Sequence, residues 1–116
     1  MIACLITLPV ADTGYNLYTL VLSTLQGLGV NTNTLNPRMA SITLQPAASN
    51  SGDLYIVPNA GAYSATGGVP DQYGWNFSNG GSYFDKAHGF NDLSLQELNV
   101  GASVDGDQLA IIGIQV

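Results

Sequence analysis

The sequence predicts a mainly β, antiparallel fold with one short helix near the N-terminus. Apolar and polar residues alternate with a period of two, most clearly over residues 92–116, as a strand with one buried face requires. Two such runs flank the Asp-Gly pair at 105–106, and this dipeptide favours a tight β-turn. A helical spacing of leucines occurs once, before residue 30. The 116 residues fit a single domain, 1–116.

The N-terminal quarter predicts an extended segment followed by the helix. Residues 2–8 are apolar, so we expect a short strand or an N-terminal arm over about residues 1–11. Asp12 and Thr13 can accept hydrogen bonds from the free amides at a helix start. A helix is therefore predicted over about residues 14–26. Its apolar stripe is Leu17, Leu20, Val21, Leu25 and Leu28.

Two strands are predicted in the middle of the chain. Residues 38–45 alternate between apolar and polar side chains, and residues 53–58 are almost continuously apolar. The segment 46–52 between them is rich in Ser, Asn and Gly, which favours an antiparallel hairpin. One face of the first strand is predicted to be buried: Ala40, Ile42 and Leu44.

The last quarter predicts a second hairpin that ends in a core strand. Its turn is placed at Val104–Asp107, between runs of alternating residues. The alternation changes phase at Gln96–Glu97 and again at Ile111–Ile112. Each change indicates a β-bulge or a strand that is covered on both faces.

Residues 59–91 contain seven of the ten aromatic residues. Alternation predicts a strand over Tyr73–Phe77, and an Asn-Gly turn then leads to a short strand over Ser82–Asp85. We expect these aromatic side chains to pack in the core or between subunits. The alternative is a carbohydrate platform, in which Trp75 or a Tyr ring lies beneath a sugar. The polar residues available to such a platform are Asp71, Asn76 and Asn79.

The composition excludes several classes of partner. Only 9% of residues are charged, and Arg38 and Lys86 are the only basic ones in a chain of net charge -6. Two cations cannot neutralise a run of phosphates, so we expect no nucleic acid, and an anionic membrane surface repels the chain. No apolar run reaches the length of a membrane span. A surface of neutral polar groups has little repulsion between copies, which favours a protein that works in an assembly.

The sequence offers little for catalysis or metal binding. Cys4 is the only cysteine, so neither an intrachain disulfide nor a structural zinc site is expected. His88 is the only histidine, and Asp85, His88 and Asp92 lack a recognised ligand spacing. Asp105–Asp107 lacks the twelve-position calcium loop, and a turn explains it more simply. We therefore expect no enzyme, cofactor or metal, and maturation in a reducing cytoplasm because disulfides and a signal peptide are lacking.

Two segments of the chain resemble a known group of proteins. The first runs from Arg38-Met-Ala-Ser-Ile-Thr-Leu-Gln to Asp53-Leu-Tyr-Ile-Val. The second combines Asn91-Asp-Leu-Ser-Leu-Gln-Glu-Leu-Asn-Val-Gly with Asp105-Gly-Asp-Gln-Leu-Ala-Ile-Ile. This pattern of hairpins, over residues 38–57 and 91–112, resembles small β-sandwich virion proteins of tailed bacteriophages, especially capsid decoration or cement proteins.

The resemblance implies a jelly-roll-like antiparallel β-sandwich, commonly a homotrimer, that binds where major capsid subunits meet on the virion surface. It implies synthesis in the host cytoplasm and carries over no catalytic or cofactor residues. The alternative is a carbohydrate-binding β-sandwich module or a receptor-binding virion tip. We expect the interface to be formed by the apolar N-terminal arm and the aromatic segment. Its predicted residues are Ile2, Leu5, Ile6, Tyr73, Trp75, Phe77, Tyr83 and Phe84.

Overall fold

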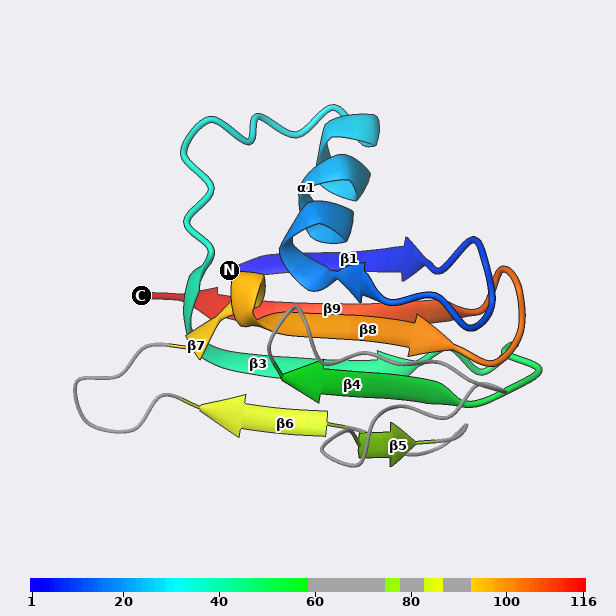
Figure 1. Ribbon diagram of the computed structural model, residues 1–116. Coiled ribbons are helices and arrows are strands. Elements are labelled where there is room, and N and C mark those ends of the chain that lie inside the picture. The colour runs from blue at the N-terminus through cyan, green and yellow to red at the C-terminus, as the bar shows by residue number, and fades with distance from the viewer. Residues whose placement is uncertain (59–74, 78–82, 87–92) are drawn as a thin grey trace.

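The computed structural model describes residues 1–58, 75–77, 83–86 and 93–116 and shows a mainly β fold with two antiparallel sheets and one helix (Figure 1). Sheet A contains, in order, β1 (Ile2–Thr7), β9 (Gln108–Gln115), β3 (Arg38–Pro46) and β6 (Tyr83–Lys86), and β7 (Leu93–Ser94) also pairs with β3. Sheet B contains, in order, β2 (Tyr15–Asn16), β8 (Leu98–Ala102), β4 (Leu54–Pro58) and β5 (Trp75–Phe77). The helices are α1 (Leu17–Gly27) and the 3-10 turn η1 (Leu95–Glu97).

The strands pair as a nested set. The first strand, β1, pairs with the last, β9, and inside them β2 pairs with β8, β3 with β6 and β4 with β5. Two further pairings, β9 with β3 and β8 with β4, join these pairs into the two sheets. Each sheet is therefore assembled from strands that lie far apart in the sequence.

The core lies between the two sheets and extends under the helix. Alternation decides which side chains enter it, because successive residues of a strand point to opposite faces. In β1, for example, Ile2 and Ile6 are buried while Ala3, Leu5 and Thr7 are exposed. The core residues of the strands are Ile2, Ile6, Met39, Ile42, Leu44, Leu54, Ile56, Val100, Ala102, Leu109 and Ile111.

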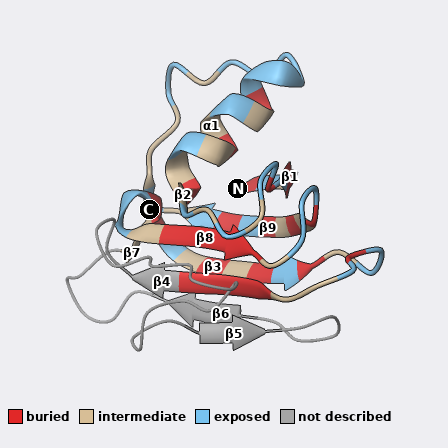
Figure 2. Cartoon of the chain, turned by 45° about the vertical axis from the view of Figure 1, so that its right-hand side comes forward, coloured by how far each residue is buried: buried red, intermediate tan, exposed pale blue. Residues whose placement is uncertain are grey.

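Helix α1 packs against β1, η1 and β8 (Figure 2). It buries Leu17, Val21 and Leu25 from the predicted stripe, whereas Leu28 lies beyond the last turn and is exposed. The helix was predicted to start at residue 14, with Asp12 or Thr13 as its cap. Instead, Asn16 is the N-cap, and its side-chain oxygen accepts a hydrogen bond from the Thr19 N–H at 3.2 Å.

The strand positions agree closely with the prediction, but all three predicted hairpins are wrong. The strands β3 and β4, β5 and β6, and β8 and β9 each lie in different sheets. A turn rich in Gly, Asn and Asp reverses the chain equally well within one sheet or from one sheet to the other. The partner is decided by the side chains that bury together.

The changes of phase in the sequence have different causes from those predicted. In β3 a register shift between Met39 and Ser41 buries Met39 and leaves Ala40 exposed, so Ala40 was wrongly assigned to the buried face. At residues 96–97 the strand is interrupted by η1. The register is regular at Ile111–Ile112, where Ile111 is buried and Ile112 is 50% exposed.

Candidate interaction surface

The outer face of sheet A is apolar and exposed. Leu5 is 47% exposed, and Ile112 and Ile114 are each 50% exposed. Small residues flank the two isoleucines, because Ile112 lies between Ala3 of β1 and Thr43 of β3. Exposed apolar residues that adjoin one another are the usual mark of a contact surface.

This face is also nearly uncharged. Strands β1, β9 and β3 contain no charged residue except Arg38, at the start of β3, whereas the edge strand β6 contains Asp85 and Lys86. The three strands lie side by side (Figure 1) and present side chains of Ala, Leu, Ile, Ser and Thr. Two such surfaces can approach each other without desolvating a charge, which favours contact with another protein.

The N-terminal residues predicted to form an interface divide between the two faces of β1. Leu5 lies on the exposed outer face. Ile2 and Ile6 are only 8% and 0% exposed and pack in the core. Residues 2–7 are paired with β9 along their whole length, so they form part of the sheet and not a projecting arm. Alternation directs Ile2 and Ile6 inward, so of the three predicted residues of β1 only Leu5 is exposed at the surface.

The predicted aromatic interface residues are placed only in part. Trp75 and Phe77 lie in β5 of sheet B, whereas Tyr83 and Phe84 lie in β6 of sheet A, opposite Leu44 and Thr43. Tyr73 lies outside the described residues, as do Asp71 and Asn79 of the predicted carbohydrate platform. Asn76 lies in β5. Both roles of this segment therefore stay predictions.

A pocket of about 320 Å³ lies at the end of the molecule that holds both chain termini. It is bounded by the start of β1, the last turn of α1, the loop after the helix and the end of β9. Its apolar lining includes Ile2, Leu25, Val30 and Leu35. Its polar side chains are neutral, namely Asn31, Thr32, Thr34 and Gln115, and Met1 with its α-amino group also belongs to the lining.

The opposite end of the molecule is formed by three loops that hydrogen bond to one another. The buried Asp107 carboxylate accepts the Ser51 N–H at 3.0 Å and the Gly52 N–H at 2.9 Å. The Asn50 side-chain amide donates to the Gln108 carbonyl at 2.7 Å, and its oxygen accepts the Gln108 N–H at 2.7 Å. The loop after β3 is therefore held firmly against the loop before β9.

The predicted Asp-Gly turn belongs to this end and acts differently from a hairpin turn. Gly106 has a φ of +80° and donates its N–H to the Leu8 carbonyl, while the Leu8 N–H donates to the Asp107 carbonyl. Gly106 and Asp107 thus lie opposite the single residue Leu8, and Gly106 adopts the left-handed backbone conformation. This arrangement is a β-bulge. The bulge extends the pairing of β1 with β9 beyond Thr7. The side chain of Asp105 accepts the Ala11 N–H at 2.6 Å.

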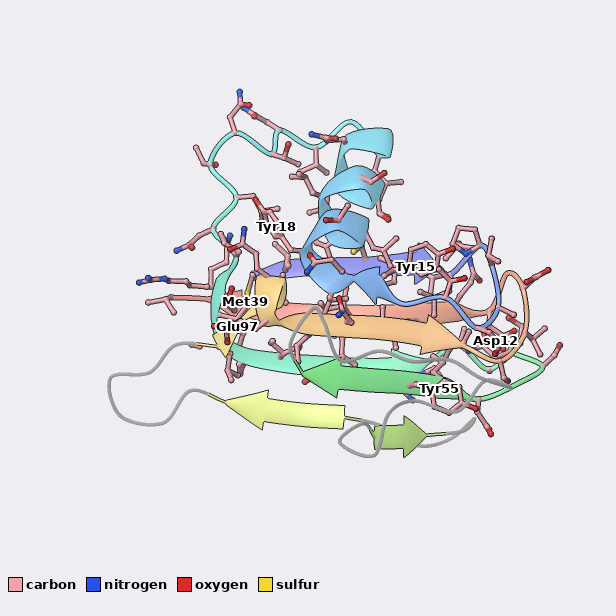
Figure 3. All side chains as sticks on the ribbon, in the orientation of Figure 1. Asp12, Tyr15, Tyr18, Met39, Tyr55 and Glu97 are labelled. Atoms are coloured by element: carbon pink, nitrogen blue, oxygen red, sulfur yellow. The ribbon has the colours of Figure 1, made fainter. Side chains whose placement is uncertain are left out.

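Burial and neighbouring carboxylates affect the pKa of one tyrosine at this end, Tyr55. Burial raises the pKa of the Tyr55 hydroxyl, and the nearby Asp53 and Asp12 raise it further. A hydrogen bond with Ser103 acts in the opposite direction. Asp12 and Tyr55 lie at the same end of the molecule, and Met39 and Glu97 lie at the other end (Figure 3). Tyr55 therefore stays neutral at physiological pH and acts in packing.

The residues considered for chemistry are not assembled into a site in the described part of the chain. Burial raises the pKa of the Cys4 thiol, which disfavours the reactive thiolate. His88 and Asp92 lie outside the described residues, and Asp85 lies in β6 opposite Ile42. Among the described residues no group of three His, Cys, Asp or Glu side chains is arranged to hold a metal ion.

The strongest surface feature was missed in the sequence, although a signal for it was present. Ile112, Ile114 and Val116 follow Ile111 in the opposite phase of alternation. In a regular strand, apolar residues that follow the buried ones in the opposite phase of alternation must lie on the outer face. Val116 is 65% exposed beside the two isoleucines on this end of the chain.

Comparisons with known proteins found no matching family model, no matching curated protein and no matching solved structure. No helix in the described residues is long and apolar enough to cross a membrane.

Proposed function

We propose that this chain is a non-enzymatic structural protein of a bacteriophage virion, a capsid decoration or cement protein that binds between major capsid subunits. The observation that supports this proposal most strongly is the outer face of sheet A over β1, β9 and β3, strands whose only charged residue is Arg38. There Leu5 of β1 and Ile112 and Ile114 of the adjoining β9 are about half exposed. A chain with so few charges gains its contacts from apolar and neutral polar surfaces.

The strand order supports a β-sandwich of the jelly-roll type. The orders β1-β9-β3-β6 and β2-β8-β4-β5 arise when a long hairpin of nested strand pairs folds over on itself. Such double-sheet folds occur in viral capsid proteins and in lectins. This fold-level argument is an analogy, and the function is argued from the surface.

The size of the face explains why many copies are needed. Three strands (β1, β9 and β3) spaced about 4.8 Å apart and about six residues long, at about 3.4 Å per residue, cover roughly 300 Å². That is less than half of the roughly 800 Å² per partner in a standard interface. A single contact is therefore weak, and many copies on a regular lattice gain affinity by avidity. We propose a homotrimer on the capsid exterior, bound to the major capsid protein.

The test uses purified virions of the phage that encodes the chain. Antibodies should detect the protein on intact heads, and heads stripped of it should rebind the purified chain. Ile112→Lys should reduce rebinding at least tenfold because a charge on the face must be desolvated. Leu28→Lys, an equal change at a residue 68% exposed beyond α1, is the matched control and should rebind normally.

Absence of the protein from purified virions would contradict the virion assignment. Equal rebinding by Ile112→Lys and Leu28→Lys would instead show that the outer face of sheet A is not the contact. Circular dichroism of both variants should match the parent chain, since neither side chain belongs to the core.

A further inference from the structure

The starting point is the pocket beside the first residues of β1. Its floor is apolar, since Leu25 and Ile2 are only 6% and 8% exposed, and no charged side chain lines it. Its volume of about 320 Å³ is near the lower limit of ligand pockets. The lining favours an uncharged occupant with apolar side chains, because a charged group would lose its hydration there.

The hydrogen bonds of β1 provide the second, independent observation. Leu8 bonds to Asp107 and Gly106 on the β9 side. Bonded and non-bonded pairs alternate in an antiparallel ladder, so Ile6, Cys4 and Ile2 also bond to β9. The backbone N–H and C=O of Ala3 therefore point away from β9, toward the open edge of sheet A.

The bonds of β9 confirm this phase. On its other side, the Val116 N–H donates to the Arg38 carbonyl, and the Gln108 carbonyl accepts the Ala47 N–H. The backbone N–H and C=O groups of the even-numbered residues of β9 thus point toward β3, and those of the odd-numbered residues point toward β1. Ala3 lines the pocket, and in the described part of the chain no residue is hydrogen bonded to its outward backbone groups.

We propose that this edge and pocket bind an extended, uncharged peptide segment of a partner protein. The segment adds as a short strand beside residues 1–3 and places one apolar side chain against Ile2, Leu25 and Leu35. Main-chain hydrogen bonds to an open strand edge provide affinity, and the adjoining pocket selects the side chain. At about 30 Å³ per water molecule, the pocket holds the volume of roughly ten waters, enough for two or three residues.

The character of β1 agrees with strand addition. Edge strands that must not pair usually carry lysine, proline or a bulge, and residues 2–7 contain no charge and no proline. Four of the eight acidic residues, Asp12, Asp53, Asp105 and Asp107, belong to the loops at the far end of the molecule, whereas Glu97 lies in η1 at the same end as the pocket. This site adjoins the outer face of sheet A at Ala3, but it does not depend on a role in a virion.

The probe is the blocked pentapeptide acetyl-Thr-Leu-Thr-Val-Thr-amide, titrated into the ¹⁵N-labelled full chain. We expect saturable shifts of the amide resonances of Ala3, Leu25 and Val30. A peptide with the same sequence and alternate N-methyl groups cannot complete the ladder and should bind at least tenfold more weakly. Replacement of its leucine by glutamate should have a similar effect.

Two variants of the protein locate the site. Ala3→Pro removes an outward N–H without breaking the pairing with β9, and it should weaken peptide binding at least fivefold. Thr7→Pro makes the same change at the far end of β1 and should alter binding less than twofold. Thr34→Trp blocks the pocket from the loop, leaves β1 intact and should abolish binding.

Several results would overturn the proposal. One is the lack of any shift of the amide resonances at millimolar peptide. Another is binding of the N-methylated peptide as tight as that of the parent peptide. A third is an equal effect of Ala3→Pro and Thr7→Pro on peptide binding. Concentration-dependent self-association that Ala3→Pro abolishes would show that a second copy of the chain occupies the edge instead. Binding of small neutral alcohols with no binding of the peptide would make the pocket a small-molecule site.

Discussion

Asp107 shows how one side chain can hold two loops of the molecule together. It is 5% exposed, and its two carboxylate oxygens accept the N–H groups of Ser51 and Gly52. A buried carboxylate needs hydrogen-bond donors, and the two bonds that meet this need fix the path of the loop after β3. Gly52 also leaves no room for a side chain, because a Cβ there would lie 2.7 Å from Val104 Cγ2.

Replacement of Asp107 by alanine should therefore destabilise the protein strongly. The N–H groups of Ser51 and Gly52 lose the charged acceptor that they share, and we expect a loss of about 2–4 kcal/mol in the free energy of unfolding. Urea denaturation followed by circular dichroism measures it. The control is Asp105→Ala, at an exposed carboxylate that accepts one N–H, which should cost less than about 1 kcal/mol. Equal losses for the two variants would refute the role given to Asp107.

At the scale of single elements, helix α1 begins after Asn16, whose side chain forms hydrogen bonds with two partners. Its oxygen accepts the Thr19 N–H, and its side-chain amide donates to the Gln96 carbonyl at 2.9 Å. The cap thus joins the helix start to η1 as well as satisfying the first turn. This long-range bond cannot be read from the local pattern that favoured Asp12 and Thr13.

Asn16→Ala should lower the free energy of unfolding by about 1 kcal/mol, the usual cost of losing an N-cap. Thermal unfolding by circular dichroism provides the measurement. Thr13→Ala changes the residue that the sequence pattern favoured and should have a smaller effect. A larger effect at Thr13 would place the helix start at the earlier position.

For the strands, the sequence could predict the positions but not the pairing partners. Alternation located the strands, because it depends only on which residues are buried. Strand partners could not be assigned, because the seven residues between β3 and β4 can return to the same sheet or cross to the other. Of the residues predicted for the interface, Leu5 is exposed and Ile2 and Ile6 lie in the core, and the outward phase of Ile112 and Ile114 was not recognised.

At the scale of the whole molecule, the nested pairing places the two ends of the chain in adjacent strands. Ile2 lies opposite Gly113 and Ile6 opposite Leu109, and the isoleucines of β1 enter the common core. The N-terminal segment is therefore part of the folded body, although the sequence alone favoured an arm that could project to a partner.

Removal of residues 1–7 should accordingly prevent folding instead of weakening assembly alone. The deletion takes Ile2 and Ile6 from the core and exposes the paired edge of β9. Loss of the native circular dichroism spectrum and of cooperative thermal unfolding is expected. The control replaces only the outer-face residues Ala3, Leu5 and Thr7 by serine and should still fold. A truncated chain that unfolds cooperatively would contradict this prediction.

The pairing of β1 with β9 also has a consequence for the newly made polypeptide. Synthesis runs from the N-terminus, so β1 leaves the ribosome well before its neighbour β9, which lies roughly 100 residues later in the sequence. Contacts between such distant residues form slowly, because a long loop must close before they gain any energy. The apolar stretch Ile2–Thr7 is consequently exposed to other nascent chains during translation, and chaperone binding in that interval will govern the yield of soluble protein.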